Sequence, residues 1–318
     1  KEDASLRVEI NQETGENLLS GMGELHIEIT VYRIENDHKV PIKVSPPIVV
    51  YRECVAKKGG PFEGKSPNKH NRFYFEVEPL QPEISKAIKE GEIPQNTRIK
   101  DPKALAKKLQ ELGWDKETSK AVVTIWDGNI LLDKTKGIQY LHETMELVVD
   151  GFKEAINQGP LANEKVRGML VSLVDAKLHE DSIHRGPGQV IPAIRNAIYG
   201  AMVLGGRVLL EPIQKVTLNV PDDLVGNVNR ELLQRRNEIV SIERVGDMTT
   251  ITTKAPVAAM FGFASSIRSA CGGRVLWATE NIGFEEVPRD LVDKTVAEIR
   301  TRKGLKPEPY DLKYYSAD

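Results

Sequence analysis

The densest set of potentially reactive side chains lies in KLHEDSIHRGPGQVIP, residues 177–192. It combines His179 and His184 with two carboxylates between them, and a Gly-Pro-Gly follows Arg185. Imidazoles and carboxylates are ligands of transition metals and are also common groups of acid–base catalysis. Three hypotheses follow: a metal site, a catalytic loop or an exposed recognition loop.

The metal hypothesis fails on spacing. The run HEDSIH resembles the zinc motif H-E-x-x-H but is one residue longer. On a helix, five residues would place the rings of His179 and His184 roughly 140° apart, so that they share no face. A strand pattern enters the segment and Gly-Pro-Gly leaves it, so we expect neither a helix nor a bound metal.

Catalysis by His184 would require a nucleophile or an orienting carboxylate. Ser182 and Asp181 are near in sequence, but no second motif such as G-x-S-x-G supports them. We therefore expect no catalytic residue in this chain.

An exposed loop is the remaining hypothesis. Gly186, Pro187 and Gly188 would sharpen a loop between a strand and a helix, and Arg185 would give it a permanent charge. A second polar segment, SPNKHNR at residues 66–72, carries side chains that bind phosphates and base edges. If the two loops meet, they form a cationic probe for RNA whose binding weakens with added salt. A generic RNA-binding module would share these features.

The segment GGPFEGKS, residues 59–66, satisfies the phosphate-binding pattern G-x-x-x-x-G-K-[ST]. A working P-loop needs a strand before it and a helix after it, which aims backbone N–H groups at phosphate. Here Pro67 follows directly, and the chain then enters the strand pattern FYFEVEPL. We interpret residues 59–66 as a mobile hairpin tip and expect no nucleotide to bind through Lys65.

Composition is that of an ordinary globular protein. The 318 residues include 40% hydrophobic and 28% charged residues, with a net charge of −2, and this length predicts more than one domain. No apolar run is long enough for a transmembrane helix. The polar first residues predict no signal peptide. Because the first residue is not Met and a strand pattern begins almost at once, we interpret the chain as a fragment. The two cysteines, Cys54 and Cys271, are expected to be reduced thiols.

Hydrophobic periodicity then predicts the strands and helices that these loops connect. Before the loop that contains His179, His184 and Gly-Pro-Gly we expect a strand over 170–178, and after it a helix from Pro192 to 204. The amphipathic pattern over 138–158 predicts a further helix. The remaining predicted elements are strands at 6–10, 40–44 and 73–80, a turn at 13–16 with a short strand after it, a helix from 21–23 onward, a helix at 101–114 capped by Asp101, and a hairpin around Asp127–Gly128.

Residues 213–284 follow the order β-α-β-β-α-β, which is the ferredoxin-like pattern. The first region shows strand-strand-helix-strand, most of the same unit. A charged helix and an aromatic tail end the chain.

Four motifs together resemble the elongation factor 2 family of ribosomal translocases. They are GMGELHIEI (21–29), SPNKHNR (66–72), IHRGPGQVIPAIRNAIYGA (183–201) and LLEPI (209–213). The resemblance covers essentially the whole chain and matches the C-terminal part of the factor. Gly-Pro-Gly where eukaryotic members carry three glycines, together with the compact fourth domain, suggests the archaeal branch.

The resemblance implies an α+β, multidomain fold, in which ferredoxin-like β-α-β sandwiches flank a ribosomal-protein-like β-α-β domain. The implied division is the end of the third domain at 1–48, the fourth at 49–207, the fifth at 208–285, and a C-terminal helix and tail at 286–318. GTP and Mg²⁺ would be bound by an N-terminal G domain outside this chain. We therefore expect no cofactor and no enzyme activity here.

The resemblance also assigns the loops. His184 matches the histidine that the family converts to diphthamide, the acceptor for ADP-ribose from diphtheria-type toxins. The implied decoding-site tip comprises Ser66, Pro67, Asn68, Lys69, His70, Arg72, Asp181, Arg185, Gly186, Pro187, Gly188 and Gln189. The implied partners are the ribosome with its RNA and proteins, tRNA and mRNA at the decoding site, and the diphthamide-synthesis enzymes. We expect a cytoplasmic monomer without membrane contact.

Overall fold

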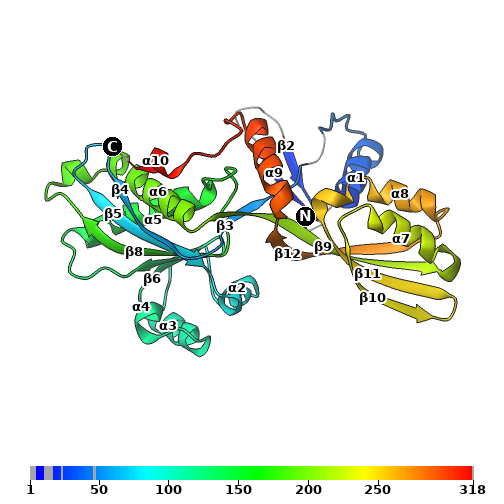
Figure 1. Ribbon diagram of the computed structural model, residues 1–318, viewed down its shortest axis with the longest axis horizontal. Helices are drawn as coiled ribbons and strands as arrows, with labels where there is room; N and C mark the ends of the chain where they lie inside the picture. The colour runs from blue at the N-terminus through cyan, green and yellow to red at the C-terminus, as the bar shows by residue number, and fades with distance from the viewer. Residues whose placement is uncertain (1–4, 11–16, 23, 46–47, 317–318) are drawn as a thin grey trace. The chain divides into compact units, whose positions relative to one another are not determined.

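The computed structural model describes residues 5–10, 17–22, 24–45 and 48–316 (Figure 1). Two compact units result: a central unit of residues 51–210 with 286–318, and a flanking unit of residues 1–50 with 211–285. Helices and strands occur in both, which confirms the α+β class. The four-domain division stays a prediction. No helix in the described ranges is long and apolar enough to cross a membrane.

The central unit is built on a five-stranded sheet in the order β4-β5-β8-β7-β6. All neighbours are antiparallel except the parallel pair β7–β8. The strands are β4 (Gly59–Lys65), β5 (Arg72–Pro79), β6 (Val122–Trp126), β7 (Asn129–Asp133) and β8 (Met169–Lys177). The predicted strands at 73–80 and 170–178 and the hairpin at Asp127–Gly128 are confirmed.

Helices cover both faces of this sheet (Figure 1). On one face lie α5 (Leu141–Asn157) and α6 (Pro187–Leu204), and on the other α2 (Pro82–Lys89), α3 (Pro102–Glu111) and α4 (Lys116–Lys120). Successive strand residues point to opposite faces, so Leu131 joins the first core whereas Leu132 joins the second. Asp101 caps α3 as predicted, accepting from the N–H groups of Lys103 and Ala104 at 3.0 Å each. Helix α5 begins at Leu141, three residues later than its periodicity predicted.

The segment that resembles a P-loop is a strand packed against α6, so its interpretation as a mobile hairpin tip was wrong. A Cβ atom on Gly64 would overlap the carbonyl oxygen of Ala193, and one on Gly59 would overlap that of Ala201. These glycines therefore let the strand backbone approach the helix backbone closely. No helix follows the segment, and a phosphate-binding loop is not formed.

A fully buried carboxylate lies where the chain enters the central unit. Strand β3 (Arg52–Val55) pairs with the start of β9 (Arg207–Pro221). The Glu53 carboxylate accepts hydrogen bonds from the backbone N–H groups of Leu161, Ala162 and Glu164 at 2.8, 2.8 and 3.0 Å. Burial raises the pKa of Glu53 to about 7, although the three N–H groups act to lower it.

This shift predicts a pH-dependent stability. The unfolded carboxyl loses its proton near pH 4.5 and the folded one near pH 7, so the folded state binds more protons between these values and stability falls as pH rises through that window. At about 1.4 kcal/mol per unit of pKa shift, the loss is about 3 kcal/mol. Urea unfolding of the wild type and of Glu53→Gln between pH 4.5 and 8 measures it. An equal pH slope in both proteins would show that Glu53 does not carry the effect.

The C-terminal segment packs on the central unit. It contains α9 (Arg289–Arg302) and α10 (Leu312–Tyr315). Arg300 donates to the carbonyl of Leu161 at 3.0 Å, and Arg207 donates to that of Tyr310 at 2.8 Å. The loop that binds Glu53 through its N–H groups is thus also held by Arg300 of α9, which donates to the Leu161 carbonyl.

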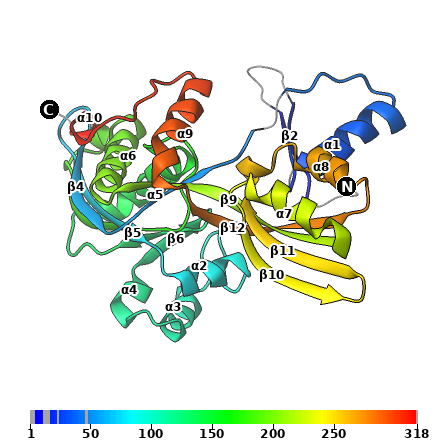
Figure 2. The ribbon, with the colours of Figure 1, turned by 45° about the vertical axis from the view of Figure 1, so that its right-hand side comes forward.

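The flanking unit contains the predicted ferredoxin-like order β9-α7-β10-β11-α8-β12. Its sheet runs β10-β11-β9-β12, with α7 and α8 on one face (Figure 2). The bounds are α7 (Val225–Leu233), β10 (Glu238–Val245), β11 (Met248–Pro256), α8 (Phe263–Ala270) and β12 (Leu276–Glu286). Val216, Ile251 and Ile267 are fully buried in the core between sheet and helices. Cys271 here and Cys54 in the central unit are both free and buried, as expected for reduced thiols.

The first region is only partly as predicted. Strands β1 (Arg7–Ile10) and β2 (Asn17–Ser20) pair, and α1 (Glu24–Tyr32) follows. The expected turn at 13–16 lies outside the described residues. The strand predicted over 40–44 is absent from the described chain, and its apolar side chains, such as Val44 at 55% exposed, face the solvent. Alternation alone does not form a strand where no neighbouring strand provides hydrogen bonds.

Candidate functional site

The two polar loops meet at one end of the central sheet, as predicted. Residues 66–71 connect β4 to β5, and residues 178–186 connect β8 to α6. Because β5 and β8 are antiparallel with Arg72 opposite Lys177, both loops leave the sheet at the same edge. We call residues 66–72 and 178–189 together the tip.

Amide side chains join the two loops. The Asn71 side chain is fully buried and donates to the carbonyl of His184 at 2.7 Å, while its oxygen accepts from the N–H of His179 at 3.1 Å. Asn68 donates to the same His184 carbonyl at 3.1 Å, and its own N–H donates to the Gln189 side chain at 2.9 Å. Asn71 was not among the predicted site residues, and its only signal was its place inside SPNKHNR.

Three imidazoles pack together at the tip. The ring centroids of His70 and His179 are 5.0 Å apart, those of His70 and His184 are 4.8 Å apart, and those of His179 and His184 are 4.5 Å apart. The segment is not an α-helix, as expected, and the separation of about 140° that a helix would give His179 and His184 therefore does not apply. The segment instead folds back through a 3-10 turn, Ser182–Arg185.

The histidine cluster is nevertheless not arranged as a metal site. The N–H of Asp181 donates to Nδ1 of His179 at 3.1 Å, which places the proton of a neutral ring on Nε2 and leaves neither nitrogen available to a metal. Across the described ranges, no group of three or more His, Cys, Asp or Glu residues could hold a metal ion.

Arg185 is buried, so its predicted role as a projecting charge was wrong. Its side chain donates to the carbonyl of Tyr140 and to the hydroxyl of Thr144, at 3.3 and 3.2 Å, and forms an ion pair with Glu143 at 3.1 Å. The guanidinium also lies 4.7 Å from the centre of the Tyr140 ring. Arg185 therefore anchors the loop to the start of α5.

Ser66 is also buried rather than available to a partner. Its hydroxyl accepts from the N–H of Asn71 at 2.9 Å and donates to the Asn68 side chain at 2.5 Å. It stabilises the turn that presents the following residues.

The Gly-Pro-Gly sequence starts a helix instead of sharpening a loop. Gly186 is the N-cap of α6 and Pro187 is its first residue, so the helix begins five residues before Pro192. Proline suits the first helical position because no N–H bond is required there. Gly188 and Gln189 consequently lie in the first turn of α6.

The exposed part of the tip is smaller than predicted. The predicted tip residues that face the solvent are Pro67, Lys69, His70, Arg72, Asp181, Pro187 and Gly188. His184 is partly buried. The charge of Arg72 is balanced by an ion pair with Glu63 at 3.2 Å. Lys69 is the exposed cation within the 66–71 turn. Ile183, which was not predicted as a site residue, is 80% exposed next to His184.

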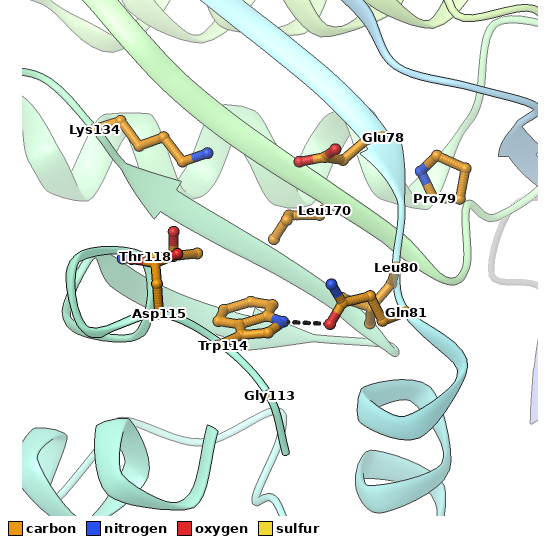
Figure 3. Close-up of a pocket in the computed structure, with 10 residues that line it drawn as sticks. All are labelled: Glu78, Pro79, Leu80, Gln81, Gly113, Trp114, Asp115, Thr118, Lys134 and Leu170. Atoms are coloured by element: carbon orange, nitrogen blue, oxygen red, sulfur yellow. Dashed lines mark hydrogen bonds between the residues drawn. The ribbon is translucent and has the colours of Figure 1, made fainter. Parts of the chain in front are cut away.

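A pocket of about 220 Å³ lies elsewhere in the central unit, beside Trp114 (Figure 3). The indole N–H of Trp114 donates to the Gln81 side chain at 2.8 Å, and Asp115 caps α4. No histidine, cysteine or serine is among the described residues that line it. Its Asp115 is used as the cap of α4, where it accepts from the N–H groups of Glu117 and Thr118, and we assign the pocket no chemistry.

Comparisons with known proteins agree with this geometry. Family models match in order along the chain: elongation factor G domain III at residues 1–46, domain IV at 91–205 and the C-terminus at 208–295. The chain is 59% identical over 317 residues to elongation factor 2 of Picrophilus torridus and, over the same length, to that of Thermoplasma acidophilum. The chain belongs to the elongation factor 2 family.

The similarity to elongation factor 2 extends over the whole chain, which nevertheless spans only 43% of the length of these relatives. Elongation factor 2 of Thermococcus kodakarensis is 56% identical over 309 residues. The tip lies within the central unit, and its second loop falls inside the match to domain IV.

Proposed function

We propose that this chain is the C-terminal portion of a translation elongation factor that promotes GTP-dependent movement of tRNA and mRNA through the ribosome. The observation that carries the proposal is the tip: two loops, joined by hydrogen bonds from the Asn71 and Asn68 side chains, present His184 at the end of a unit whose residues 91–205 match elongation factor G domain IV. The order of the three family matches supports it further.

In this proposal the tip enters the decoding site and contacts RNA there. Lys69, His70 and Arg72 supply exposed cationic or polar groups that can bind phosphates. The amide side chains of Asn68 and Asn71 and the buried Arg185 keep the loops in one conformation, so that a partner does not have to order them on binding. The tip acts by shape and charge, without an acid–base pair.

His184 is the proposed diphthamide position. Its partly buried ring lies in the histidine cluster next to exposed residues, where a modifying enzyme can reach it. Diphthamide-synthesis enzymes and ADP-ribosylating toxins are then partners of this residue.

GTP hydrolysis is assigned to the part of the factor outside this chain. Nucleotide-driven rigid-body motion of the domains would move the tip. The complete factor is proposed to act in the cytoplasm as a monomer, and this chain alone is proposed to bind neither GTP nor Mg²⁺.

A substitution in the complete factor tests the proposal. His184→Ala should increase frameshifting severalfold and leave GTP hydrolysis nearly unchanged, because the residue belongs to the tip and not to the nucleotide site. Ribosome-stimulated GTPase and dual-reporter frameshifting assays measure the two effects, with His142→Ala as a control outside the tip. Loss of GTPase with normal frame maintenance would contradict the tip model, and no change in either assay would favour a generic RNA-binding module.

A further inference from the structure

We infer that Asn71 is the positioning residue for His184, acting across the two tip loops. The inference rests on the proposed function, because that function is what makes the position of His184 important. The structural part of the claim stands on the hydrogen bonds of the tip alone.

Asn71 uses both ends of its amide across the gap between the loops. The NH₂ group donates to the His184 carbonyl at 2.7 Å, and the oxygen accepts from the His179 N–H at 3.1 Å. The side chain is fully buried, so water cannot replace either bond without opening the tip. A buried polar group that loses its partner carries a large cost. One side chain thereby fixes the backbone at two of the three clustered histidines.

The backbone of Asn71 positions the third histidine of the cluster, His70. Its N–H donates to the Ser66 hydroxyl, and its carbonyl accepts from the N–H of Ser66 at 3.0 Å. This closes the turn that contains His70 and brings its ring to 4.8 Å from that of His184. The position of the His184 imidazole is therefore determined by a residue 113 positions away in sequence.

The His184 carbonyl also accepts a hydrogen bond from the side-chain NH₂ group of Asn68, at 3.1 Å. Asn68 is less buried than Asn71 and makes no bond to the 179 backbone, since its oxygen accepts from the His70 N–H and the Ser66 hydroxyl. Loss of the Asn68 donor removes one of two bonds to the carbonyl. Loss of the Asn71 donor also removes one of the bonds to the carbonyl, and in addition it leaves the buried end of the residue-71 side chain without a hydrogen-bond partner. The two asparagines should therefore differ in effect.

The substitution Asn71→Asp separates positioning from packing. It keeps the shape of the side chain and the oxygen that accepts from His179, but places an oxygen against the His184 carbonyl where a donor stood. Asn68→Asp makes the same chemical change at the weaker position. If Asn71→Asp fails to fold, Asn68→Asp still tests whether the amide donors position His184.

Selective ¹³C-histidine labelling gives a direct readout, since the chain has six histidines: His26, His38, His70, His142, His179 and His184. In the wild type we expect nuclear Overhauser contacts among the rings of residues 70, 179 and 184. Asn71→Asp should abolish the contacts to the His184 ring and shift the three tip signals, leaving the other three unchanged. Asn68→Asp should weaken these contacts only. Intact ring contacts in Asn71→Asp, or equal effects of the two variants, would overturn the inference.

A second measurement links the position to the proposed modification. In a host that makes diphthamide, the modified fraction of the peptide containing His184 should fall about tenfold in Asn71→Asp. An unchanged fraction would overturn the functional part of the inference. If the wild type carries no modification, the proposed function fails at this residue while the ring contacts still decide the positioning claim.

Discussion

Replacing Gly64 with alanine should lower the free energy of unfolding of the central unit by about 3 kcal/mol. The added Cβ would overlap the carbonyl oxygen of Ala193 and crowd the Ala197 side chain. These are backbone and short side-chain atoms, which cannot rotate away, so strand β4 would have to separate from helix α6. The two elements form one side of the largest core of the unit, and the separation would affect the tip that they support.

Gly188→Ala is the matched control. No atom lies within 4 Å of its Cβ position, and its backbone is not left-handed. In the first turn of α6 the change should be neutral or stabilise by about 0.5 kcal/mol. Urea unfolding followed by tryptophan fluorescence in a Trp277→Phe background would report on the central unit alone, since Trp114 and Trp126 both lie there. Equal stability of the two variants would contradict the close packing of β4 on α6.

His184→Ala should completely abolish ADP-ribosylation by a diphtheria-type toxin. In the proposed function the modified imidazole of His184 is the acceptor, and alanine has no imidazole ring to modify. His179→Ala is the informative control, because it removes a neighbouring imidazole at 4.5 Å and leaves the proposed acceptor in place. Incorporation of labelled ADP-ribose into natively produced protein measures both. Label retained in His184→Ala would place the acceptor elsewhere.

Local patterns in the sequence predicted much of this fold. The order of strands and helices in the ferredoxin-like region depends on hydrophobic periodicity, and the start of α3 depends on the Asp101-Pro102 pair, so both were visible. The local pattern left open whether the two tip loops meet; the family resemblance implied it, and the pairing of β5 with β8 explains it. The strand at 40–44 was wrong because its alternation has no neighbouring strand to pair with among the described residues.

The internal construction of the tip was not visible in the sequence. Arg185 looked like a surface charge because its partners lie more than forty residues earlier, at the start of α5. The histidine cluster combines His70 from one loop with two rings from another, and spacing within a single segment does not show this. Burial of Asn71 depends on the same contact between loops. Such long-range pairings decide which polar side chains are structural and which can meet a partner.

The mass of the peptide that contains His184 tests the proposed role of the tip most directly. Protein made in an archaeal host that synthesises diphthamide should be digested and this peptide weighed, with the same chain made in a host lacking the pathway as reference. We expect a mass increase of one diphthamide group, located by fragmentation on His184. An unmodified peptide from the competent host, or an increase on His179, would contradict the claim that His184 is the residue modified at the tip.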